Sequence, residues 1–182
     1  QIVKDFEYAA ELEYIVTKAE RNTFVCDLVG HLSGNTLVLF QFVEKHGKIL
    51  YDIIHDKYKD RKVFFVFGGV ATDIREEIRE IVENEKDAVI VASYGTFSTG
   101  INIRNINNIV FASPSKSKIR VLQSLGRGLR QQGGDKTLRL YDISDDLSLD
   151  SKLNFTLRHF KERLNIYDDQ KFDYEIKRIN LK

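Results

Sequence analysis

Short apolar runs alternate along this chain with segments in which apolar residues recur every three or four positions. Such runs are typical of strands buried on both faces of a sheet, and the longer spacing indicates amphipathic helices. The predicted strands are 36–42, 63–67, 88–92, 108–112 and 137–143. The predicted helices are 6–32, 43–58, 72–82, 117–130 and 153–164. This alternation predicts an α/β domain, with a parallel sheet that carries helices on both faces.

Local signals refine these boundaries and divide the chain. We expect Asn22 to cap the second of two helices within 6–32, and Gly34 to close that helix. Thr72 is expected to cap the helix that starts there. Residues 172–179 alternate between apolar and polar, as in a half-exposed strand or an extended tail. The predicted parts are a helical lead-in (1–35), a core (36–150) and a C-terminal helix with a strand or tail (151–182).

The composition fits an ordinary globular domain, with 182 residues of which 42% are hydrophobic and 30% charged. No apolar run approaches the ~20 residues of a membrane span, so no membrane partner is expected. The single cysteine, Cys26, excludes an internal disulfide and favours a reducing, cytoplasmic setting. The chain begins at Gln1 and contains no methionine, which indicates a fragment of a longer protein.

The net charge of +1 conceals an uneven distribution of charged residues. Residues 104–139 contain eight basic side chains and one acidic side chain, whereas residues 73–87 contain seven acids and three bases. A basic stretch inside a nearly neutral domain indicates a local anionic partner. A solvated surface without a partner is the alternative interpretation of such a cluster.

Several loops that follow the predicted strands are candidates for function. In open parallel sheets, ligands bind beyond the carboxyl ends of the strands. The candidate loops at these ends are Gly68–Gly69, 93–102 and 113–118. Their common location predicts a single ligand-binding edge.

Gln123, Arg127 and Arg130 stand at positions i, i+4 and i+7 of the predicted helix 117–130, along one polar stripe. Planar guanidinium groups suit phosphate oxygens. Two glycines lie between these residues, and each costs a helix roughly 1 kcal/mol relative to alanine, which indicates close approach of a partner to the backbone. A solvated basic helix face fits the same pattern and is the alternative.

Three segments resemble motifs of superfamily 2 helicases. Residues 123–130 resemble motif VI, residues 93–102 resemble motif V, and residues 36–41 stand where motif IV is expected. The resemblance covers nearly the whole chain as the second RecA-like domain of such an enzyme, which has a P-loop NTPase-type fold. It implies that the full protein is an ATP-dependent DNA helicase that acts on branched DNA, such as forks or Holliday junctions, in recombination and repair.

The resemblance assigns five residues to ATP hydrolysis. Arg127 and Arg130 would act as arginine fingers on the γ-phosphate, and Gln123 would orient them or the attacking water. Gly100 would let the backbone approach the nucleotide, and Asn102 would support it. An ordinary turn without a ligand is the alternative interpretation of this glycine and asparagine.

The resemblance also implies DNA contacts from the motif IV and motif V loops. Contacts of this kind bind backbone phosphates and position a strand without reading its sequence. The motif V loop is slightly longer than in commoner versions, which leaves open whether Ser93 or Thr96 contacts the phosphate. The expected DNA-contacting residues are Phe40, Gln41, Ser93, Thr96, Arg104, Lys116 and Lys118.

The chain lacks the sequence motifs that hold a nucleoside triphosphate. It has no phosphate-binding loop of the form G-x-x-x-x-G-K-[ST] and no D-E-x-H box. ATP and Mg²⁺ would therefore be held mainly by an N-terminal RecA-like lobe, and this stretch alone is expected to be inactive. His31, His46, His55 and His159 share no metal-ligand spacing and are interpreted as surface or hydrogen-bonded helix residues.

Two other functions stay open on the sequence alone. One is a non-catalytic nucleic-acid-binding module with a degenerate helicase fold, and the other is a doubly wound enzyme for a phosphorylated metabolite. A Walker A lysine and a D-E-x-H box upstream of Gln1 would favour the helicase over both.

Overall fold

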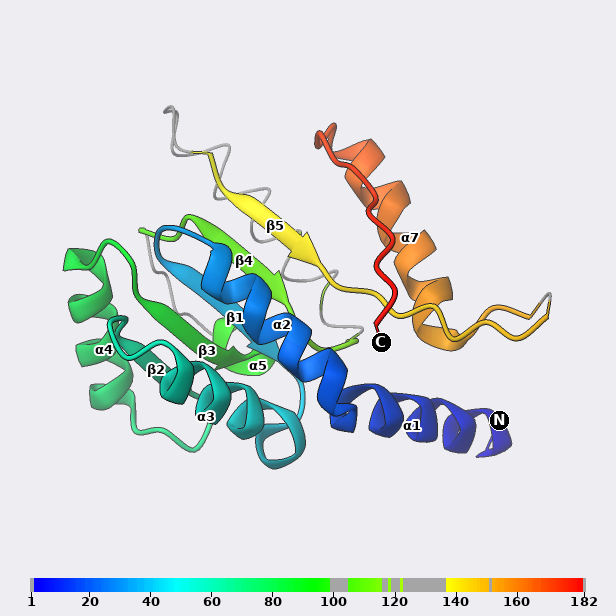
Figure 1. The fold of residues 1–182 in the computed structure, drawn as a ribbon, viewed down its shortest axis with the longest axis horizontal. Coiled ribbons are helices and arrows are strands. Elements are labelled where there is room, and N and C mark those ends of the chain that lie inside the picture. Colours follow the sequence, from blue (N-terminus) through cyan, green and yellow to red (C-terminus); the bar gives the residue numbers. More distant parts are fainter. Residues whose placement is uncertain are drawn as a thin grey trace.

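A five-stranded parallel sheet forms the centre of the molecule, with the strands in the order β2-β3-β1-β4-β5 (Figure 1). The computed structural model describes residues 2–98, 105–115, 118, 122, 137–150 and 152–181. All four strand pairings are parallel. The strands are β1 (Thr36–Phe40), β2 (Val63–Val66), β3 (Val89–Ser93), β4 (Asn108–Phe111) and β5 (Arg139–Asp142).

Helices pack on both faces of this sheet (Figure 1). The side chains of α2 and α3 contribute to the hydrophobic cluster on one face, and those of α4, α7 and Leu122 contribute to the cluster on the other. The predicted α/β architecture is therefore confirmed. The helices are α1 (Ile2–Thr17), α2 (Ala19–His31), the π-helix η1 (Val43–Gly47), α3 (Lys48–Lys57), α4 (Thr72–Asn84), α5 (Tyr94–Ser98) and α7 (Phe155–Asp169).

The central position of β1 in the sheet explains why its residues 37–40 are all apolar. Leu37 and Leu39 belong to one hydrophobic cluster, and Val38 and Phe40 belong to the other. All four side chains are fully buried. Successive side chains of a strand point to opposite faces, so a strand covered by helices on both sides needs apolar residues at every position.

The break between the first two helices lies at Lys18, not at Asn22 as the sequence predicted. Lys18 has an extended backbone (φ −69°, ψ 114°), and Asn22 lies inside α2. The Asn22 Nδ2 group donates a hydrogen bond of 2.9 Å to the Val16 carbonyl oxygen. A buried carbonyl at the end of a helix needs a partner, and this amide supplies one from the next helix.

One further boundary prediction is wrong. Thr72 is the first residue of α4 and does not cap it, because Ala71 occupies the capping position without a side-chain hydrogen bond. Of the two alternatives for the C-terminal residues, the tail is the one observed: residues 172–181 form no regular strand and run back along α7 (Figure 1). Among the helices that the structure describes, none is long and apolar enough to cross a membrane.

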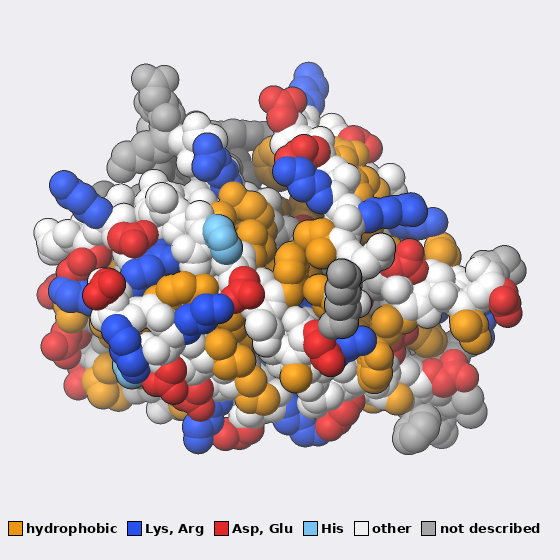
Figure 2. Space-filling model, in the orientation of Figure 1, with side chains coloured by type: hydrophobic (Ala, Val, Ile, Leu, Met, Phe, Trp, Pro, Cys, Tyr) orange, Lys and Arg blue, Asp and Glu red, His pale blue; other side chains and the backbone are white. Residues whose placement is uncertain are grey.

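Charged side chains of both signs are interspersed over the face shown in Figure 2, and hydrophobic side chains gather near its middle. Partly buried α2 residues that extend the cluster on this side of the sheet include Phe24 and Leu28. Within the described residues, this face therefore carries no continuous basic patch of the kind that binds a polyanion.

Candidate nucleic-acid interface

The carboxyl ends of the five strands lie along one edge of the sheet, because every pairing is parallel. The register aligns Phe40 with Ser93 and Leu39 with Phe111, so the segments that follow β3, β1 and β4 are immediate neighbours. The described parts of the three candidate loops therefore share this edge, as the sequence predicted. We call it the carboxyl edge.

Gln41, at the centre of the carboxyl edge, is exposed and is held at two points. Its backbone N–H donates to the Ser113 Oγ at 3.1 Å, and its side-chain Oε1 accepts a hydrogen bond of 2.8 Å from the Ser115 hydroxyl. The residue that follows β1 is thereby tied to the segment after β4. Gln41 was a predicted DNA contact, whereas the two serines were named only as part of their loop.

Ser93 and Thr96 act together at the end of β3. Their hydroxyl oxygens hydrogen-bond at 2.6 Å, and the Thr96 N–H donates to the Ser93 Oγ at 3.3 Å. Thr96 is only 3% exposed, whereas Ser93 is half-buried. Of the two candidates for a phosphate contact, Ser93 is the one with more accessible surface.

Phe40 does not offer its side chain to DNA, and that prediction is wrong. The ring is fully buried in the cluster beneath α2 and α3, with its centroid 5.5 Å from that of Phe65. A Cβ atom added to Gly47 would lie 2.5 Å from the same ring, so the start of α3 packs directly on it. The residue is a core residue because β1 is covered on both faces.

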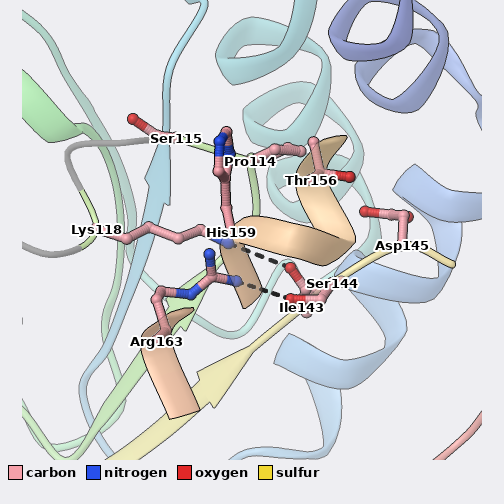
Figure 3. Close-up of a pocket in the computed structure, with 9 residues that line it drawn as sticks. All are labelled: Pro114, Ser115, Lys118, Ile143, Ser144, Asp145, Thr156, His159 and Arg163. Atoms are coloured by element: carbon pink, nitrogen blue, oxygen red, sulfur yellow. Dashed lines mark hydrogen bonds between the residues drawn. The ribbon is translucent and has the colours of Figure 1, made fainter. Parts of the chain in front are cut away.

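Lys118 is also not available to DNA in this structure, which corrects a second prediction. Its side chain is 1% exposed, and its Nζ lies 3.1 Å from Asp142 Oδ1. The same Nζ donates to the Ile143 carbonyl oxygen at 3.2 Å (Figure 3). Burial lowers the pKa of Lys118 to about 8, although the negative charge of Asp142 acts to raise it.

Asp142 is the centre of a buried ionic cluster at the end of β5. Arg163 binds its carboxylate in a bidentate manner, with Nε 2.6 Å from Oδ2 and Nη2 3.0 Å from Oδ1. The Tyr167 hydroxyl donates to Oδ2 at 2.7 Å. Burial alone would raise the pKa of Asp142, but the charges of Lys118 and Arg163 hold it at about 2. The cluster therefore stays ionised at neutral pH and joins α7 to the sheet.

This cluster explains why the buried face of α7 differs from its predicted apolar stripe. The stripe residues Leu157 and Leu164 are half-buried, whereas Thr156, Arg163 and Tyr167 are at most 5% exposed. Arg163 and Tyr167 are buried because they hydrogen-bond to the charged end of β5, whereas Thr156 donates its backbone N–H to Glu11. Apolar periodicity finds the helix but not these contacts.

A small hollow opens beside the ionic cluster, between the ends of β4 and β5 and the start of α7 (Figure 3). The Lys118 and Arg163 cations that line it are paired with Asp142, and Asp145 is paired with Arg21 at 2.7 Å. Glu11 accepts hydrogen bonds from the first backbone N–H groups of α7. Because these charges are balanced within the protein, we assign the hollow no phosphate.

The remaining predicted site residues lie outside the described residues. Within the part of the chain that the structure describes, no group of three or more His, Cys, Asp or Glu side chains is arranged to hold a metal ion. The predicted residues outside the described part are Gly100, Asn102, Arg104, Lys116, Gln123, Arg127 and Arg130.

Comparison with known proteins identifies the class. The family of the helicase conserved C-terminal domain matches residues 20–132, and the chain belongs to this family. The RecA-like fold of such domains accounts for the parallel sheet with helices on both faces.

Among individual proteins, the chain is 36% identical to the ATP-dependent DNA helicase UvsW of enterobacteria phage T4, over 98% of this chain and 38% of UvsW. The crystal structure of T4 UvsW superposes with a TM-score of 0.79 at 37% identity, covering 96% of this chain and 37% of that one. The C-terminal domain of the DEAD-box protein Dbp5 shares the fold, with a TM-score of 0.61 at 14% identity over 85% of this chain and 82% of that one. The chain thus spans less than two fifths of the length of UvsW.

Proposed function

We propose that this chain is the second motor lobe of an ATP-dependent DNA helicase. The observation that carries the proposal is the carboxyl edge of a helicase C-terminal domain, where the half-buried Ser93 ends β3 and the exposed Gln41 follows the neighbouring strand β1. The similarity to UvsW, an ATP-dependent DNA helicase, supports DNA as the nucleic acid. Branched DNA, such as forks or Holliday junctions, is the finer part of the proposal and rests wholly on the resemblance to UvsW.

In this proposal the lobe completes a nucleotide site that its N-terminal partner lobe mainly builds. ATP and Mg²⁺ would be bound mainly by that lobe, where the γ-phosphoryl group would be transferred to water and ADP would leave. Arg127 and Arg130 would stabilise charge that develops on the γ-phosphate, since guanidinium forks match phosphate oxygens. Gln123 would orient these groups or the attacking water. Gly100 would let the backbone approach the nucleotide closely, and Asn102 would support that loop.

The same lobe would hold one DNA strand along the carboxyl edge. Gln41 and Ser93 offer neutral hydrogen-bond donors, which position phosphates without reading base sequence. Arg104 and Lys116 would add positive charge. Thr96 would act mainly through its hydrogen bond to Ser93, because its own side chain is buried. The lone, buried Cys26 is consistent with action in the reducing cytoplasm of a host cell.

Arg127→Ala tests the proposal in a protein that contains both lobes. Loss of a finger that contacts transition-state charge should lower kcat for ATP hydrolysis by roughly 10³–10⁵-fold while ATP binding is largely kept. Arg127→Lys should restore little activity, because an ammonium group cannot replace a planar fork. Single-turnover hydrolysis and nucleotide binding would be measured together, with thermal melts as the check on folding.

Arg120→Ala is the matched control, because it removes a basic residue two turns earlier in the same predicted helix, where we expect at most an auxiliary contact. It should keep most of the ATPase activity. If Arg127→Ala hydrolyses ATP within about threefold of the unmodified protein, a barrier change of well under 1 kcal/mol, the assignment of the finger is wrong.

A further inference from the structure

A buried chain of hydrogen bonds runs from α2 to the carboxyl edge. It begins at Asn22, whose Oδ1 lies 3.0 Å from His46 Nε2. His46 Nδ1 lies 2.5 Å from Ser113 Oγ, and this Oγ accepts the backbone N–H of Gln41. Asn22, His46 and Ser113 are each at most 2% exposed, so the chain reaches solvent only at Gln41.

The partners determine which atom is the donor in each hydrogen bond of this series. Asn22 donates Nδ2 to a backbone carbonyl, so its Oδ1 faces His46 and can only accept. His46 Nε2 therefore carries the hydrogen, and Nδ1 accepts the hydroxyl proton of Ser113. Burial, with a further contribution from the charge of Arg21, lowers the pKa of His46 to about 3, which keeps the ring neutral at physiological pH.

The backbone around His46 brings this ring to the strand end. His46 and Gly47 close the π-helix η1, a rare conformation that occurs preferentially at functional sites. Gly47 leaves room for the Phe40 ring, which an added Cβ would meet at 2.5 Å. The turn can therefore pack directly on β1, one residue before Gln41.

Ser113 is fixed from a second side, which makes it a rigid support. Its carbonyl oxygen accepts a hydrogen bond of 2.9 Å from the fully buried Tyr94 hydroxyl. On the surface, Ser115 holds the Gln41 side chain by Oε1 at 2.8 Å. The Gln41 backbone and side chain are thus both held in place before any ligand binds, and the Nε2 group remains a donor suited to a phosphate oxygen.

We propose that His46, Ser113 and Ser115 are positioning residues that hold Gln41 in the geometry needed to bind a DNA backbone phosphate. The inference rests on the proposed function, since it assumes that Gln41 contacts DNA. A prearranged donor binds more tightly because the entropy of ordering it is lost during folding and not during binding. This role explains why His46 and Ser113 are polar although they are buried, since apolar side chains of similar size could not hold Gln41 by hydrogen bonds.

The test compares DNA affinity among variants of the full 182-residue chain, with a fluorescent single-stranded oligonucleotide at low salt as the probe. Gln41→Ala removes the proposed contact, and Ser113→Ala removes the hydroxyl that holds it. Each should weaken binding by about two- to tenfold, as expected for one neutral hydrogen bond. The double variant should bind no more weakly than Gln41→Ala alone, because Ser113 acts through Gln41.

Thr36→Val is the matched control at the opposite edge of the same sheet. It also removes a buried hydroxyl that makes two hydrogen bonds, one to the Gly34 carbonyl oxygen and one from Asn108. It should lower the melting temperature by an amount similar to Ser113→Ala without changing DNA affinity. Ser115→Ala is a second test at a half-buried position, where folding should be retained, and should also be non-additive with Gln41→Ala.

The binding results distinguish the positioning role of the serines from the DNA contact of Gln41. If Gln41→Ala weakens binding but both serine variants bind normally, the positioning role is overturned and the DNA contact stands. Additive losses in the double variants would equally overturn it, since the serines would then act independently of Gln41. Unchanged binding by Gln41→Ala itself would overturn the DNA contact and the inference with it.

Discussion

Burial separates residues that the sequence alone treats alike. Gln41 and Lys118 both belong to the predicted DNA-contacting set, yet one is exposed at the carboxyl edge and the other is 1% exposed in an ionic cluster. His46 and His55 are both helical histidines, but His55 is exposed and His46 joins a buried hydrogen-bond chain. The function of each side chain therefore depends on what surrounds it more than on its chemical type.

The burial of His46 should make the folding stability depend on pH, and a variant at this position can isolate that effect. Its pKa is about 3 in the folded chain and near 6.5 when unfolded. Between these pH values the unfolded state binds more protons than the folded state. The stabilisation that neutral His46 contributes is therefore complete above pH 6.5 and is lost as the pH falls towards 3. The slope from one such group is at most about 1.4 kcal/mol per pH unit.

Urea unfolding of the unmodified chain and of His46→Gln, at several pH values from 7 to 4, measures this effect. The stability difference between them should shrink as pH falls, because glutamine has no proton to bind. Carboxylates that titrate in the same range contribute equally to both proteins and cancel. Parallel pH profiles would show that His46 is not held neutral in the folded state.

At the scale of elements, α7 is held at two points, one on α1 and one at the end of β5. Glu11 of α1 accepts the backbone N–H groups of Phe155 and Thr156 at the start of α7. Arg163 and Tyr167, further along the helix, bind Asp142 at the end of β5. The second attachment includes Lys118 of the segment 117–130, so α7, β5 and the start of that segment share one carboxylate.

Variants of the ionic cluster should lose more folding stability when they leave a buried charge unpaired than when they remove a single hydrogen bond. Asp142→Asn leaves two buried cations without a counter-charge and should destabilise the chain by about 3–5 kcal/mol. Tyr167→Phe removes one hydrogen bond to an ionised group and should cost about 1.5–3 kcal/mol. Denaturant unfolding followed by circular dichroism would measure both.

Glu175→Gln is the control for these variants, because it breaks the exposed ion pair between Glu175 and Lys177 in the C-terminal tail. Exposed pairs contribute little, so this variant should unfold as the unmodified chain does. An Asp142→Asn variant as stable as Tyr167→Phe would contradict the central role of the carboxylate.

At the scale of the whole molecule, the parallel sheet brings loops that are far apart in sequence to one edge. The segments after β1, β3 and β4 are adjacent there, although Gln41 and Ser113 are separated by 72 positions. A strand of nucleic acid that crosses this edge meets several of them at once.

Salt dependence distinguishes charged contacts from neutral ones across the carboxyl edge. Binding of duplex DNA should weaken with salt, and Lys116→Ala or Arg104→Ala should each make the slope of log K against log salt about 0.9 less negative. Gln41→Ala should lower affinity and leave the slope unchanged, because its contact releases no counterion. The measurement is a titration by fluorescence anisotropy at several salt concentrations.

Lys118→Ala is informative in the same titration. Its ammonium group is buried against Asp142, so its loss should lower the melting temperature and leave the salt slope as it was. A flatter slope for this variant would mean that Lys118 leaves the ionic cluster to bind DNA. An unchanged slope for both Lys116→Ala and Arg104→Ala would place the DNA path elsewhere on the domain.

The sequence by itself determined the architecture, because apolar periodicity reflects which faces of each strand and helix are covered. The uninterrupted apolar run of β1 predicted a strand buried on both sides, and the motif order predicted the family to which the chain belongs. The parallel arrangement then implied a common edge for the loops 68–69, 93–102 and 113–118. These properties depend on local patterns, which a single sequence records.

Only the tertiary structure decided which polar groups face one another. Phe40 and Gln41 are neighbours in sequence, but the pleat of β1 and the close packing at Gly47 bury the first and leave the second exposed. Lys118 pairs with Asp142, and His46 with Ser113, across separations of 24 and 67 residues. Such partners are chosen by the packing of distant elements, because a buried polar group must find a hydrogen bond wherever the fold supplies one.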